Sequence, residues 1–234
     1  MLGCILADDC RIHSERFFRG GHNALLPFVM FLSKHVQLSG EDWGRQKKAI
    51  MSGVFSGAAA RMGAFARNKV AGSKQFPLHE LIALVKREYG IKSLDDLLRR
   101  HLDLALNIAH GGMDRNPEDL QRDHIFPKSQ LEKQGYPYEI VNHYANFHFL
   151  RGVDNLNKLD KPPDDWFKNP GRDVPPYSDR DLDERLLTWD DLQPGHFESM
   201  IDKRGQKIRQ KAVQLFGIEE AEFDALLADN QPQR

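Results

Sequence analysis

The chain has 234 residues, of which 40% are hydrophobic and 29% are charged, a composition typical of a soluble globular protein with a sizeable core. Lys and Arg total 33 against 34 for Asp and Glu, so the net charge of -1 excludes a chain-wide basic surface. Any contact with a nucleic acid must therefore be local. Two cysteines, Cys4 and Cys10, indicate neither a disulfide framework nor a structural zinc site.

Membrane insertion and secretion are not expected from the sequence. The longest apolar run, residues 24–32, contains Pro27 and is too short to span a bilayer. The N-terminus lacks the basic start and the small-residue cleavage site of a secretory signal. We therefore expect a cytoplasmic protein with no membrane partner.

Helical periodicity dominates the first half of the chain. Apolar residues recur at steps of three and four in several short segments, for example Leu25, Phe28, Val29 and Leu32. Two further helix faces are predicted, one by Leu78, Leu81, Ile82 and Val85 and the other by Leu94, Leu97, Leu98 and Leu102. Residues 20–108 are thus predicted to form an all-helical unit.

The pattern changes at Gly111-Gly112. Residues 111–180 are rich in Asn, Asp, Pro and Gly, and the short apolar runs 124–126 and 147–150 predict strands beside loops. Helical periodicity returns after Leu186, where the spacing of Phe197, Ile201 and Ile208 predicts a helix that Gly217 caps. The predicted regions are 1–110 (helical), 111–180 (a core with short strands) and 181–234 (C-terminal helices packing on the helical region).

Charge is distributed unevenly along the chain. No acidic residue lies between Asp42 and Glu80, a stretch that includes Lys47, Lys48 and Arg67. This stretch is either an ordinary solvated helix surface or a surface that contacts phosphates. Residues 164–191 instead hold nine acids, so we expect that segment to face away from a nucleic acid.

One group of residues carries the chemistry that phosphodiester hydrolysis requires. The attacking water must lose a proton, and the neutral imidazole of His124 is suited to accept it near pH 7. Oxygen donors such as Asp123 and Asn155 suit Mg²⁺ or Mn²⁺, which can neutralise the charge on the leaving oxygen. Neighbours on a regular strand point to opposite faces, so Asp123 and His124 serve one site only if the strand ends or bends there, as Pro127 favours.

The spacing of these residues resembles the HNH, or ββα-metal, nuclease family. The matching pattern is an acid-His pair, then Ile125, Pro127 and Ser129, then a central Asn, a second Asn nine residues later and a Lys three after that. The resemblance implies a small ββα-metal insertion, a β-hairpin plus helix, in a mainly α chain whose helical bundle flanks it. It implies His124 as general base, Asp123 and Asn155 as ligands of one divalent metal, and Asn146 as the residue that bonds the loop backbone and aims His124.

The same resemblance implies phosphate or DNA contacts, for which the candidates are Arg151, Lys158, Lys128, Lys161, Lys47, Lys48 and Arg67. His143 and His148 are interpreted as loop or strand histidines, and Arg122 as a residue that shields or orients Asp123. Asn155 stands where many members of the family have His, which disfavours a transition metal held by imidazole.

A wider resemblance is to the C-terminal half of GmrSD-type restriction endonucleases, in which an HNH domain lies inside a helical region. It covers roughly residues 20–217 and is strong at 121–163, through Asp-His-Ile-Phe-Pro-Lys-Ser and Asp-Asn-Leu-Asn-Lys-Leu-Asp-Lys-Pro-Pro. It implies DNA cleavage in defence against foreign, including modified, DNA. The Asp-Gly-Gln-Gln-Arg signature of that family's nucleotide-binding domain is missing from the sequence. The chain is therefore expected to be a nuclease half, as a fragment, a subunit or a decayed copy.

Three functional interpretations remain open from the sequence. The first is a DNA endonuclease, and the second is a regulatory or DNA-binding subunit that needs a separate nucleotide-binding partner. The third is a degenerate structural domain that keeps the hairpin without binding metal. The sequence also leaves a homo-oligomer open.

Overall fold

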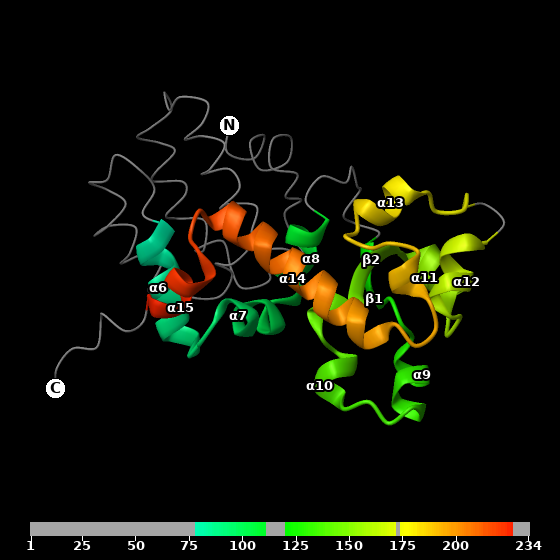
Figure 1. The fold of residues 1–234 in the computed structure, drawn as a ribbon, viewed down its shortest axis with the longest axis horizontal. Helices are drawn as coiled ribbons and strands as arrows, with labels where there is room; N and C mark the ends of the chain where they lie inside the picture. The colour runs from blue at the N-terminus through cyan, green and yellow to red at the C-terminus, as the bar shows by residue number, and fades with distance from the viewer. Residues whose placement is uncertain (1–77, 111–119, 172–173, 227–234) are drawn as a thin grey trace. The chain divides into compact units, whose positions relative to one another are not determined.

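The computed structural model describes residues 78–110, 120–171 and 174–226 of the chain. The chain is mainly helical, with a two-stranded antiparallel hairpin packed against helices (Figure 1), which confirms the predicted fold class. Two compact units divide it, one of residues 1–104 and 212–234 and the other of residues 105–211. The helices predicted before residue 78 lie outside the described residues, as does the basic stretch with Lys47, Lys48 and Arg67. No described helix combines the length and the apolar character needed to cross a membrane.

The hairpin lies in the unit of residues 105–211 and consists of β1 (Leu120–His124) and β2 (Phe147–Arg151). The register pairs Asp123 with His148 and His124 with Phe147. Directly paired residues project to the same face, so Asp123 and His148 share one face and His124 shares the other with Phe147. The strand predicted at 147–150 is confirmed, whereas the one predicted at 124–126 was wrong, because β1 precedes this run and ends at His124.

Helix α11 (Gly152–Lys158) begins at the residue that follows β2, which gives a continuous strand–strand–helix order (Figure 1). Asp154 lies in its first turn, where a carboxylate is favoured by the helix dipole. Arg151, at the N-cap, donates from Nε and an Nη to the two carboxylate oxygens of Asp154, at 2.8 and 3.1 Å. This bidentate pair fixes the turn from β2 into α11.

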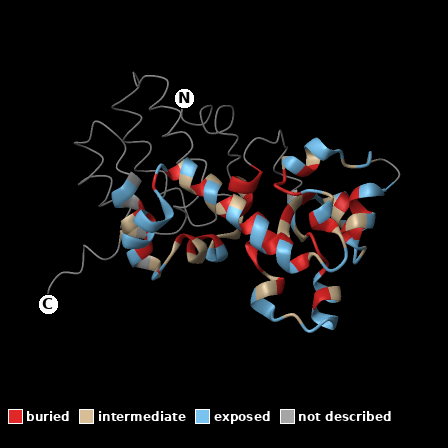
Figure 2. Cartoon of the chain, in the orientation of Figure 1, coloured by how far each residue is buried: buried red, intermediate tan, exposed pale blue. Residues whose placement is uncertain are grey.

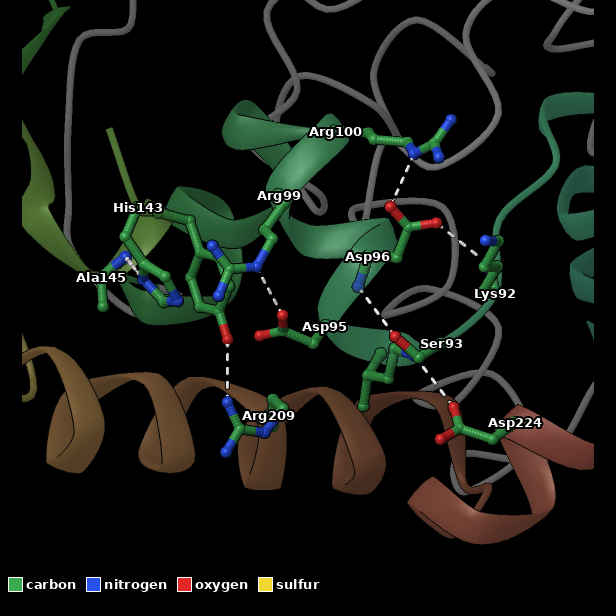
Figure 3. A network of polar contacts seen from close by, with 12 residues as sticks. Lys92, Ser93, Asp95, Asp96, Arg99, Arg100, His143, Ala145, Arg209 and Asp224 are labelled. Atoms are coloured by element: carbon green, nitrogen blue, oxygen red, sulfur yellow. Dashed lines mark hydrogen bonds and ion pairs between the residues drawn. The ribbon is translucent and has the colours of Figure 1, made fainter. Parts of the chain in front are cut away.

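The loop between the strands contains α9 (Lys128–Lys133), α10 (Tyr138–Val141) and the 3-10 turn η5 (Tyr144–Asn146). Pro127 and Pro137 stand just before α9 and α10, a position where a proline starts a helix without losing a backbone hydrogen bond. His143 caps η5 by accepting a hydrogen bond at Nδ1 from the amide of Ala145 at 3.0 Å (Figure 3). Ile125, Leu131, Val141 and Tyr144 are buried, so the loop carries its own core.

Short helices follow the hairpin unit: α12 (Pro163–Lys168), α13 (Asp179–Asp183) and the 3-10 turn η6 (Asp190–Leu192). Acids of the segment 164–191 occupy the first turns of these elements. Asp181 also completes a capping box with Ser178. Much of the acidity of this segment is thus used to start helices.

The long helix α14 (Phe197–Phe216) confirms the C-terminal helical prediction. Its buried residues include Phe197, Met200, Arg204 and Ile208, and buried and exposed positions alternate along it (Figure 2). Gly217 follows with φ +65°, the left-handed conformation expected of a helix cap. Arg204 is completely inside: it donates to the carbonyl oxygens of Arg185, Ala145 and Phe147 at 2.9, 2.6 and 2.7 Å.

The other unit contains α6 (Leu78–Tyr89), α7 (Leu94–Arg100) and α15 (Glu220–Ala225). Ser93 caps α7 by accepting from the amide of Asp96 at 3.1 Å, and the carboxylate of Asp224 accepts from the amide of Leu94 at 3.1 Å (Figure 3). The predicted helix face from Leu94 to Leu102 was wrong in one respect. The chain breaks at His101, and α8 (Leu102–Ala109) starts a new helix.

Candidate active site on the hairpin

Asp123, His148 and Lys158 meet on one face of the hairpin. Oδ2 of Asp123 is 3.3 Å from Nε2 of His148, its partner on β2. The ammonium of Lys158, the last residue of α11, donates to the same Oδ2 and to the main-chain carbonyl of His124. The side chains of His148 and Lys158 are 0% and 1% exposed, and that of Asp123 is 17% exposed. A carboxylate is therefore held between the strand pair and the helix.

The charge of this cluster is set by burial and by hydrogen bonds. Burial by itself would raise the pKa of Asp123, but the hydrogen bond from His148 and the positive charge of Lys158 outweigh it and lower that pKa to about 2. Burial lowers the pKa of His148 to about 3, although its contact with Asp123 works in the opposite direction. At neutral pH the cluster therefore holds an ionised Asp123 and a neutral His148.

The neutral state of His148 defines its tautomer. Nε2 faces a carboxylate, which is only an acceptor, so the ring proton is on Nε2. Nδ1 is buried without a hydrogen-bond partner, and the ring packs on Phe167 with centroids 5.6 Å apart. His148 thus acts as a donor that fixes the position of the Asp123 carboxylate. The sequence interpretation of His148 as a strand residue missed this contact, which only the strand register reveals.

His124 projects from the other face of the hairpin, where its ring packs on Phe147 with centroids 4.1 Å apart. Its Nε2 is 3.1 Å from Oδ1 of Asn142. Burial lowers the pKa of His124, and the hydrogen bond with Asn142 partly offsets that effect. The imidazole is therefore neutral near pH 7, the state that a general base requires. β1 ends at His124, and the Lys158 ammonium bonds both the Asp123 side chain and the His124 carbonyl.

Asn146 lies immediately before β2 and is 0% exposed. Its Oδ1 accepts from the amide of Phe126 at 3.0 Å, and its Nδ2 donates to the carbonyls of Val141 and Phe126 at 2.9 and 3.3 Å. This is the loop-bonding contact that the HNH resemblance implies. It joins the segment after His124 to the end of α10, so the chain cannot continue as a strand beyond β1.

The oxygen donors of the predicted metal site were examined for their fit to a hard divalent cation. Every contact to Asp123 described above goes to Oδ2, and Oδ1 accepts no hydrogen bond from the described residues. Nδ2 of Asn155 donates to Oε1 of Gln121 at 2.9 Å, and Gln121 shares the β1 face of Asp123. One carboxylate and one amide oxygen fit Mg²⁺, which keeps several waters. Within the described ranges, no three His, Cys, Asp or Glu side chains cluster where they could hold a metal.

The predicted phosphate contacts differ in position. Lys158 is buried against Asp123, so its ammonium does not lie on the surface. Arg151 is exposed but bonds Asp154. Lys128 is exposed and lies 3.6 Å from Glu132, and the ammonium of Lys161 lies over the ring of Trp166. The structure thus brings Asp123 and Lys158 together and leaves the other cations apart from that cluster.

Comparison of the chain with family models, with curated proteins and with solved structures finds no match. The functional interpretation therefore depends on the motif residues and on the geometry described above.

Proposed function

We propose that the chain is a metal-dependent HNH-type endonuclease that hydrolyses DNA phosphodiester bonds, in defence against foreign DNA. The observation that carries the proposal is the strand–strand–helix unit. In it the Asp123 carboxylate lies between β1 and α11, and the neutral imidazole of His124 follows on the same strand. The spacing of Asn146, Asn155 and Lys158 supports the same assignment.

The proposed reaction assigns one step to each residue. His124 accepts a proton from the attacking water, a bond forms between that water oxygen and phosphorus, and the bond from phosphorus to the leaving oxygen breaks. Asp123 and Asn155 would hold the divalent cation, which when bound supplies positive charge near the leaving oxygen. Asn146 keeps the backbone after His124 in place. Arg151, Lys128 and Lys161 are proposed as DNA contacts.

Plasmid nicking tests this proposal. The full chain is incubated with supercoiled plasmid and Mg²⁺ or Mn²⁺, with His124→Ala as the test variant. His196→Ala is the matched control, because His196 is partly exposed and bonds only residues around Asp190. We expect metal-dependent nicking by the wild type and the control, and its loss in His124→Ala. Equal nicking by His124→Ala and the wild type would reject the proposal.

A second candidate function is a regulatory subunit that does not cut DNA without a separate nucleotide-binding partner. The specific observation in its favour is the Lys158 ammonium, which already neutralises Asp123 where a cation would bind. Calorimetric titration with Mn²⁺ separates the two functions, with Asp123→Ala and Asn155→Ala as controls. Binding that both variants abolish supports the endonuclease. No binding by the wild type supports the regulatory subunit.

A further inference from the structure

Asn142 is oriented by the helix that precedes it. It is the C-cap of α10, and its Nδ2 donates to the carbonyl oxygen of Tyr138 at 2.9 Å. The opposite amide orientation would set two carbonyl oxygens against each other, so the NH₂ group is committed to the helix end. Oδ1 of Asn142 therefore points away from the helix as an acceptor.

That acceptor faces His124. Oδ1 of Asn142 is 3.1 Å from Nε2 of His124, so the imidazole proton is on Nε2. In a neutral imidazole the other nitrogen then carries a lone pair. Nδ1 of His124 contacts no polar group among the described residues, and the ring is held against Phe147. Rotating the ring to exchange the nitrogens would break both contacts.

We infer that Asn142 is a positioning residue that fixes the Nε2–H tautomer of His124 and so leaves Nδ1 as the nitrogen that accepts the proton. The inference rests on the proposed function for its catalytic meaning, but the tautomer itself is independent of catalysis. When Nδ1 takes the proton from water, the ring becomes an imidazolium whose Nε2–H still donates to Oδ1 of Asn142. Hydrogen bonds from a charged donor are stronger, so this contact also favours the protonated state.

The test begins with the tautomer. Histidines of the full chain are labelled with ¹⁵N, and long-range proton–nitrogen spectra identify which ring nitrogen carries the proton. The chain has ten histidines, so His124→Gln assigns the His124 signal by its loss. Asn142→Leu removes the acceptor at similar size, and Asn142→Asp keeps it. Asn169→Leu is the matched control, because Asn169 is also a helix C-cap whose Nδ2 bonds four residues back, at Asp165.

We expect the Nε2–H form in the wild type, Asn142→Asp and Asn169→Leu, and a mixture of tautomers in Asn142→Leu. A wild-type Nδ1–H form, or an unchanged Nε2–H form in Asn142→Leu, would overturn the inference. The circular-dichroism spectrum and melting temperature of Asn142→Leu are compared with those of Asn169→Leu, so that a loss of folding is recognised. In that case the wild-type and Asn142→Asp spectra still decide the tautomer.

Kinetics separates the inference from the proposed function. Residues that orient a histidine are worth roughly 10- to 100-fold in activity, so kcat for nicking should fall by about that factor in Asn142→Leu while KM stays constant. Asn142→Asp should restore most of kcat. A wild type that never nicks DNA rejects the nuclease but not the tautomer assignment. A wild type that nicks while Asn142→Leu keeps full kcat rejects the positioning role alone.

Discussion

Replacing Asn146 with alanine removes the side-chain amide that joins the loop after β1 to α10. The buried amide of Phe126 loses its acceptor at 3.0 Å, and the carbonyl of Val141 loses its donor at 2.9 Å. The third contact, to the carbonyl of Phe126, is longer at 3.3 Å. Each buried polar group left without a partner costs about 1–3 kcal/mol. Two such groups predict a decrease of ~3 kcal/mol or more in the free energy of unfolding.

Urea unfolding followed by circular dichroism measures this change, with the slope of the transition compared between variants. The matched control is Asn169→Ala, which removes one exposed side-chain contact and should change stability by less than ~0.5 kcal/mol. Asn146→Asp keeps the acceptor for Phe126 but sets an anionic oxygen against the carbonyls of Val141 and Phe126. It should be at least as destabilising as alanine. A loss of less than ~1 kcal/mol in Asn146→Ala with an unchanged slope would refute the reasoning.

Three further predictions concern buried charge around the hairpin. His148 has a lowered pKa, about 3 in the folded chain against an ordinary 6.5, so its stabilising effect is complete above pH 6.5 and is lost as pH falls toward 3. This loss amounts to up to ~5 kcal/mol, and His148→Gln, which keeps an N–H donor, should flatten the measured stability–pH curve in that range. Lys158→Met should raise calorimetric Mn²⁺ affinity by about tenfold, because the ammonium competes for the Asp123 carboxylate; unchanged affinity would contradict this. Arg204→Lys keeps the charge but loses the fork that serves three carbonyls, so urea unfolding should show a loss of ~2 kcal/mol, and none if the fork is unimportant.

The sequence predicts the parts of the fold that local pattern controls. Alternating apolar residues identify β2, spacing at three and four residues identifies α14, and Gly217 marks the end of that helix. The motif spacing also predicts that a carboxylate, an imidazole and a buried asparagine lie around one hairpin. These features depend on residues that are near one another along the chain.

The extent of β1 could not be predicted in the same way. Its residues Gln121, Arg122 and Asp123 are polar, so they lack the apolar alternation that marks a strand. They form a strand because β2 pairs with them. The run 124–126 is more apolar, but the Asn146 amide binds the backbone of Phe126 and ends the ladder. Tertiary hydrogen bonding thus overrides local propensity here.

The contacts of the candidate site depend on residues far apart in the chain. Asp123 and His148 are paired by strand register, and no local pattern reveals that register. Lys158 is interpreted from sequence as a phosphate contact, yet its position at the end of α11 turns its ammonium inward to Asp123. Asn142 gives no signal beyond that of a helix-ending residue, and its contact with His124 requires the folded loop.

The rate constant for the first nick in supercoiled plasmid, measured at saturating Mn²⁺ for the wild type and His124→Ala, tests the central claim most directly. A general base contributes about 10²- to 10⁴-fold, so the wild type should be at least ~100-fold faster than His124→Ala and equal to His196→Ala. No nicking by the wild type, or equal rate constants for the wild type and His124→Ala, would contradict it.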